Sequence, residues 1–174
     1  MLIAYALLVV VGSTWHLLPK PICDAVPDVA AVTAGFLGLT VRRDIAAALA
    51  GSIVLGYLRD VVSGAPAGFF ALVLAITCLI ARAVQQRLYV RGPSMTLAFS
   101  AFVAVASSLV ARGVGSAFHI PGAAFSLEVR HMFAAAVTTA LVAPIVWRIF
   151  RRVDAAFART QRERDAALDG LAPR

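Results

Sequence analysis

The sequence predicts an all-α membrane protein, a polytopic bundle of about six transmembrane helices. Of its 174 residues, 61% are hydrophobic and 14% are charged, whereas a soluble domain is roughly half apolar and about a quarter charged. Long apolar runs recur along the chain, and most approach the roughly 20 residues that a helix needs to cross a hydrocarbon core of about 30 Å. These runs are rich in alanine and leucine and lack the alternation of barrel strands, which favours helices.

Six segments reach or approach the spanning length, approximately residues 2–18, 26–41, 45–62, 68–90, 95–111 and 129–150. The second contains Asp28 and has a short apolar part, so a five-helix bundle stays open as an alternative. No Lys or Arg precedes the first segment and further spans follow it, which predicts a retained helix rather than a cleaved signal peptide. The longest loop is expected at residues 112–128. We predict that residues 1–150 form the bundle and residues 151–174 a basic, helical, cytoplasmic tail.

Small residues at helical spacing predict where the helices pack, because lipid supplies no hydrophobic driving force between them. The third segment carries two overlapping pairs, Ala47 with Gly51 and Ser52 with Gly56. We therefore expect the third helix to occupy the centre of the bundle.

The positions of Lys and Arg predict the orientation, since cytoplasmic loops carry the excess. With six spans, one side receives twelve arginines: Arg42, Arg43, Arg82, Arg87, Arg91, Arg148, Arg151, Arg152, Arg159, Arg162, Arg164 and Arg174. The other side receives four basic residues: Lys20, Arg59, Arg112 and Arg130. Both termini are therefore expected in the cytoplasm. The net charge of +7 then reflects topology and attraction to anionic headgroups, not nucleic-acid binding.

A cationic collar is expected where the last span leaves the cytoplasmic face of the membrane. Its members are Arg148, Arg151 and Arg152, whose long side chains can reach the interface. The following residues, 153–168, remain compatible with a helix until Gly170. This tail either docks a partner or extends into solvent as an anchor of the bundle.

The segment 56–68 is the strongest candidate for a functional site, because it places charged residues and a tight turn between two apolar runs. Ser63, Gly64 and Pro66 form the reversal: Gly64 can adopt a left-handed helix cap, and Pro66 cannot continue a helix. The fourth helix is then expected to start near Gly68, where its first backbone N–H groups lack partners within the helix.

Asp60, in the last turn of the third helix, lies where the negative end of the helix dipole disfavours an anion. We expect its carboxylate to accept hydrogen bonds from the start of the fourth helix and so to tie the two helices together. Arg112 or Arg130 could add an ion pair on the same side of the membrane, while Arg59 points elsewhere on its helix. A ligand or partner site and a proton-transfer role stay open as alternatives.

The chain lacks the residue patterns of enzymes and metal sites. No phosphate-binding loop, nucleophile elbow or His-Glu-x-x-His helix occurs. Glu128 and His131 have the spacing of half a di-metal site, but the sequence offers no second half. Cys23 and Cys78 fit neither a metal site nor a disulfide framework. We expect no catalytic activity, no cofactor and no metal.

A helix that ends in Gly-x-x-x-Asp, followed by Ser-Gly-x-Pro-x-Gly, resembles the family of the bacterial rod shape-determining protein MreD. The matching positions are Gly56, Asp60, Ser63, Gly64, Pro66 and Gly68, with Leu72 at the apolar position that usually follows. Chain length, number of spans and the basic cytoplasmic end are similar over nearly the whole chain. Arg59 and the long basic tail depart from the family pattern. The resemblance implies a non-catalytic component of the elongation complex in the inner membrane, which regulates cell shape and lateral peptidoglycan synthesis.

The resemblance also implies partners in the membrane. These are the scaffold MreC, bound through its membrane helix, then RodA with its transpeptidase, and MreB indirectly; the homo-oligomeric state stays open. The MreD family is similar in architecture to the substrate-binding subunits of energy-coupling-factor transporters, so a vitamin-binding transporter subunit is the alternative function. Those subunits usually carry an Ala-x-x-x-Ala face in the first helix, and residues 2–18 offer none.

Overall fold

The structure is a computed structural model that describes residues 6, 10, 26–40, 45–87, 93–118 and 125–169. Within these ranges the chain is helical apart from short turns, and it contains no strand. The all-α class is therefore confirmed for the described residues. The predicted first span, except for residues 6 and 10, and Cys23 lie outside them.

Five helices follow one another in the described chain: α2 (Val29–Thr40), α3 (Ile45–Ser63), α4 (Phe69–Arg87), α5 (Pro93–Ala117) and α6 (Phe125–Asp169). The last four are long and apolar enough to cross a membrane, which supports a multi-pass membrane protein. With its 12 residues, α2 measures only about 18 Å at 1.5 Å per residue. It is therefore too short to span a bilayer alone.

Two boundaries differ from the sequence prediction. Residues 112–117 and 125–128 of the expected outer loop are helical, because α5 continues to Ala117 and α6 already begins at Phe125. Gly113 and Gly115 thus lie inside a helix, where the backbone satisfies its own hydrogen bonds in an apolar surrounding. The last span and the tail form one continuous helix that ends at Asp169, next to Gly170.

The centre of the bundle is α2, not α3 as the small-residue pairs suggested. Every residue from Val29 to Leu39 except Leu37 is buried, and α2 packs against α3, α4, α5 and α6. A helix that is apolar on all sides is expected in the interior. By contrast, α3 buries a small-residue face and exposes large apolar side chains such as Tyr57 and Val61.

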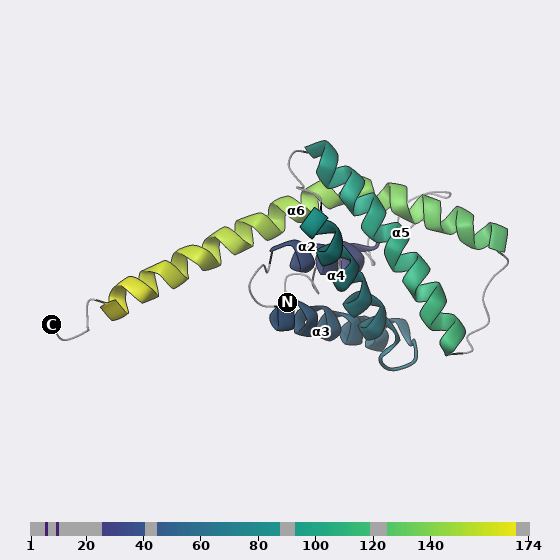
Figure 1. Cartoon of the computed structure of the whole chain (residues 1–174), viewed down its shortest axis with the longest axis horizontal. Coiled ribbons are helices and arrows are strands. Elements are labelled where there is room, and N and C mark those ends of the chain that lie inside the picture. The colour runs from purple at the N-terminus through teal and green to yellow at the C-terminus, as the bar shows by residue number, and fades with distance from the viewer. Residues whose placement is uncertain are drawn as a thin grey trace.

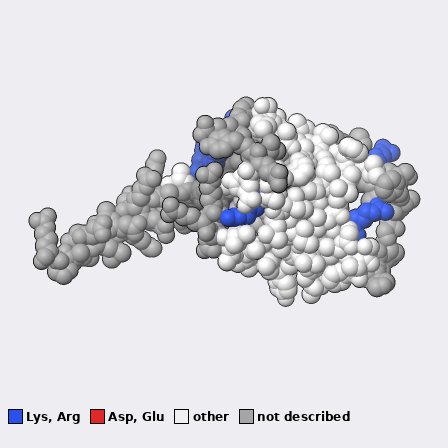
Figure 2. Space-filling model, viewed as in Figure 1, with Lys and Arg blue, Asp and Glu red and all other residues white. Residues whose placement is uncertain are grey.

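The outer surface of the bundle is apolar, as lipid contact requires. On α6, large side chains recur every four residues with roughly 60–70% exposure: Phe133, Val137, Leu141 and Ile145. Figure 2 shows one face of the molecule that is almost free of charge, with basic side chains near its two ends. In Figure 1, α6 continues as a single rod well beyond the other helices.

Candidate functional site: the Asp60 cap and the Asp28–Arg59 ion pair

The Asp60 carboxylate caps the start of α4, as the sequence predicts. Its Oδ2 accepts a hydrogen bond from the backbone N–H of Gly68 at 2.9 Å, and its Oδ1 accepts one from Phe70 at 2.8 Å. Asp60 is only 3% exposed, so these bonds form in a setting where water does not compete. The positive end of the α4 dipole offsets the unfavourable position of this anion at the end of α3.

The turn between α3 and α4 depends on two glycines with positive φ. Gly64, directly after α3, has φ 66°, and Gly68, directly before α4, has φ 91°. The Gly68 carbonyl accepts the first hydrogen bond of α4, from Leu72 at 3.0 Å. A side chain at either glycine would be strained, because L-residues rarely adopt positive φ. Ser63 Oγ donates to the Arg59 carbonyl at 2.7 Å and so contributes within α3.

Gly56 brings the backbones of α3 and α4 into direct contact. A Cβ atom at this position would lie 2.4 Å from the Cα of Ala71 and 2.5 Å from the carbonyl oxygen of Phe70. Asp60 follows four residues later on the same face of α3. The close approach at Gly56 therefore delivers the carboxylate to the first turn of α4, which explains the Gly-x-x-x-Asp spacing physically.

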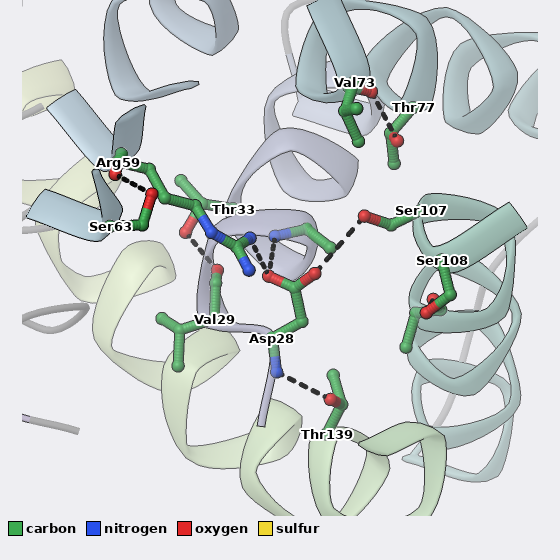
Figure 3. A network of polar contacts seen from close by, with 12 residues as sticks. Asp28, Val29, Thr33, Arg59, Ser63, Val73, Thr77, Ser107, Ser108 and Thr139 are labelled. Carbon is green, nitrogen blue, oxygen red and sulfur yellow. Dashed lines mark hydrogen bonds and ion pairs between the residues drawn. The ribbon is translucent and has the colours of Figure 1, made fainter. Parts of the chain in front are cut away.

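Asp28, which the sequence analysis treated as a weak point of a span, is the N-cap of α2. Its Oδ1 accepts from the backbone N–H of Ala31 at 3.1 Å and from Arg59 Nη1 at 2.7 Å. Its Oδ2 accepts from Ser107 Oγ at 3.2 Å, and its backbone N–H donates to Thr139 Oγ1 at 2.9 Å. The partners come from α2, α3, α5 and α6, and Figure 3 shows their contacts converging on Asp28.

The Asp28–Arg59 ion pair adds α4 to this junction. The guanidinium Cζ of Arg59 lies 4.1 Å from the centroid of the Phe70 ring, within the range of a cation–π contact. The two side chains are largely shielded, with 26% exposure for Arg59 and 18% for Asp28. Charges inside a membrane bundle are tolerated when they pair. The ion pair, the hydrogen bonds of Asp28 and the Arg59–Phe70 contact thus link all five described helices near the start of α2.

The predicted charge partners lie in different places. Arg59 does point away from Asp60, toward Asp28. The hydrogen bonds that the structure shows at the Asp60 carboxylate come from the backbone N–H groups of Gly68, directly before α4, and Phe70. Arg112 and Arg130 have exposed positions on α5 and α6.

The three arginines of the predicted collar are on α6, where its apolar stretch Val129–Val153 ends. Arg148, Arg151 and Arg152 are all exposed. They lie far along the bundle from Asp60, next to the aromatic contacts that Trp147 makes with Phe36.

Sequence reasoning missed Asp28 as a site residue, although a local signal was present. Pro27 and Asp28 directly precede an apolar run, and Asp is a preferred N-cap residue. Reading this pair as a helix start would have moved the beginning of the second helix from residue 26 to Val29. The pairing with Arg59 had no such local signal.

The described side chains include no metal-binding cluster and no buried polar atom without a partner. No three of their His, Cys, Asp and Glu residues gather as a metal site, and every buried side-chain nitrogen and oxygen among them has a hydrogen-bond partner. His131 is exposed, and the side chain of Glu128 lies outside the described set. Cys78 is a buried, free cysteine.

A small apolar hollow lies between α2 and α6. It is too narrow to admit even a water molecule, whereas a typical small-molecule site has roughly 300–1,000 Å³. The residues that line it are mostly aliphatic: Pro27, Val29, Val32, Thr139, Val142, Ala143 and Val146. It therefore offers little to hold a polar ligand.

Comparison of the chain with models of protein families, with curated proteins and with solved structures finds no match.

Proposed function

We propose that this chain is a non-catalytic membrane component of the bacterial elongation complex, similar to MreD. In this role it binds the scaffold MreC beside it in the inner membrane and helps to link MreB to RodA and its transpeptidase. Cell shape and lateral peptidoglycan synthesis would then depend on it.

One observation carries the proposal: the residues of the MreD-like motif form a single structural unit. Gly56 permits the contact between α3 and α4, Asp60 caps α4, and Gly64 and Gly68 adopt the backbone conformations that the turn needs. The motif is thus explained by the physical demands of one rigid turn, with no need for substrate chemistry. A protein that acts by presenting a fixed binding surface requires a rigid turn of this kind.

The surface offered to MreC is expected to be a large-residue apolar face rather than a small-residue face. Gly51, Ser52 and Gly56 on α3 are buried inside the bundle, as are Ala104 and Ala136 on the later helices. Small residues that already hold the bundle together cannot also receive a partner helix. Docking therefore falls to exposed apolar side chains, held in place by the rigid turn.

The direct test is co-purification of the full chain with MreC of the same organism from detergent-solubilised membranes. We expect recovery of MreC with the wild type and reduced recovery with Asp60→Ala and Gly68→Leu, together with rounded cells. Ser63→Ala is the matched control inside the motif, because Ser63 is exposed and bonds only within α3. Equal amounts of each variant in the membrane must be established first.

Failure of the wild type to retain MreC would overturn the proposal. Normal MreC recovery and normal shape in both variants would remove the turn from the mechanism while leaving the complex itself intact. The alternative function, a vitamin-binding transporter subunit, would need a ligand site other than the hollow between α2 and α6, which is too small for one. A ligand-induced rise in the melting temperature of the purified protein would support that alternative instead.

A further inference from the structure

We propose that Arg148, Arg151 and Arg152 form a binding site for the phosphate of an anionic phospholipid headgroup, at the end of the bundle where α6 leaves it. This inference does not depend on the role in the elongation complex. It rests on the placement of three guanidinium groups, on the aromatic support beneath one of them, and on the charges of the surrounding side chains.

The three arginines share one side of α6 at the boundary of its apolar stretch. Arg151 follows Arg148 by three residues and Arg152 follows it by four, which are the spacings of neighbours on a helix surface. All three are exposed, and the apolar stretch of α6 ends at Val153. Exposed arginines near the end of an apolar stretch can extend their guanidinium groups to the level of the lipid phosphates.

An aromatic cluster positions Arg151 before any ligand arrives. Its Cζ lies 5.8 Å from the Trp147 ring centroid, within cation–π range. Trp147 is only 8% exposed and makes edge contacts with Phe36 at 5.3 Å and Phe99 at 6.4 Å between ring centroids. Because this base is fixed, Arg151 has less side-chain freedom to lose when it binds a phosphate.

Among the side chains that the structure describes, no carboxylate lies beside the three arginines; Asp154 follows Arg151 by three residues on α6, and its side chain is outside the described set. Both described carboxylates are elsewhere: Asp28 precedes the N-terminus of α2 and Asp60 caps α4. Trp147 instead packs on Phe36, toward the opposite end of α2. Arginine binds phosphate oxygens through two parallel hydrogen bonds. Since lipid phosphates surround this level of the bundle at high local concentration, a lipid is the expected source.

The test uses the purified full chain in detergent micelles, titrated with phosphatidylglycerol or with zwitterionic phosphatidylcholine. We expect phosphatidylglycerol to raise the unfolding temperature in a saturable way and phosphatidylcholine to leave it unchanged. In Arg148→Gln/Arg152→Gln the apparent affinity should fall at least tenfold, whereas Arg148→Lys/Arg152→Lys should retain much of it. Trp147→Phe should lower it a few-fold, because it weakens the support of Arg151.

The matched control is Arg112→Gln/Arg130→Gln, which removes the same charge from exposed positions near the other end of the bundle. It should bind phosphatidylglycerol like the wild type. An equal loss of phosphatidylglycerol affinity in this control would show general electrostatic attraction and overturn the proposal. Wild-type affinity in Arg148→Gln/Arg152→Gln would exclude the site and overturn it as well. Inorganic phosphate that produces the same shift without lipid would reassign the site to free phosphate.

Discussion

Removal of the Asp60 carboxylate tests the account of the turn most directly. In Asp60→Ala the backbone N–H groups of Gly68 and Phe70 lose their acceptor in a buried position. A hydrogen bond to a charged group contributes about 1.5–3 kcal/mol to stability, so two such bonds predict a loss of at least about 3 kcal/mol. Such a loss changes the folding equilibrium roughly 150-fold.

The buried thiol of Cys78 provides the assay. Cys78 is 2% exposed on α4, so a thiol-reactive dye labels it only when the bundle opens. In a Cys23→Ser background, the labelling rate at fixed detergent reports the fraction of open molecules. We expect Asp60→Ala to raise this rate by about two orders of magnitude, as the loss of two charge-assisted bonds requires. Asp60→Asn should raise it less, because its side-chain oxygen can still accept one of the two bonds.

Ser63→Ala is the control in the same turn. Its exposed hydroxyl bonds only to the Arg59 carbonyl, and a surface change of this kind alters stability by about 0.5 kcal/mol or less. If Asp60→Ala labels within twofold of Ser63→Ala, the cap is not a major stabilising contact and the reasoning fails.

Two further predictions use the same labelling assay. Gly56→Ala should destabilise the bundle by about 1–3 kcal/mol through overpacking, since the new Cβ would lie 2.4 Å from Ala71 Cα. The control Gly113→Ala places its Cβ in open space on α5 and should be neutral or stabilising by up to about 1 kcal/mol. Equal effects of the two variants on stability would contradict the close approach of α3 and α4 at Gly56. Asp28→Asn and Arg59→Gln should each lower the free energy of unfolding by a few kcal/mol, because each leaves a shielded charge without its partner. The double variant should lower it by clearly less than the sum of the two single effects. Strict additivity would show that the two side chains are not coupled.

The parts of the fold that sequence predicted correctly depend on short separations along the chain. Apolar run length located α3 within one residue at its C-terminus and α4 within one residue at its N-terminus. The Asp60 cap joins residues only eight and ten positions apart, so the turn residues between them define it. The left-handed conformation of Gly64 follows from the same local rules.

The contacts that sequence did not predict join distant segments. Asp28 meets Arg59, Ser107 and Thr139 across separations of 31, 79 and 111 residues. No local pattern specifies such a meeting, because it depends on how the helices cross. Likewise, the spacing of small residues predicted α3 as the central helix, whereas in the structure α2 is central because it packs against α3, α4, α5 and α6.

The sequence by itself determined that this protein is a set of long apolar helices with a rigid, carboxylate-capped turn, because hydropathy and turn chemistry act over a few residues. Only the tertiary structure decided that the short helix α2 lies in the middle and that Asp28 is neutralised by Arg59. In an apolar bundle a charge must find its partner wherever packing brings one within reach, and that choice is made by the arrangement of all the helices together.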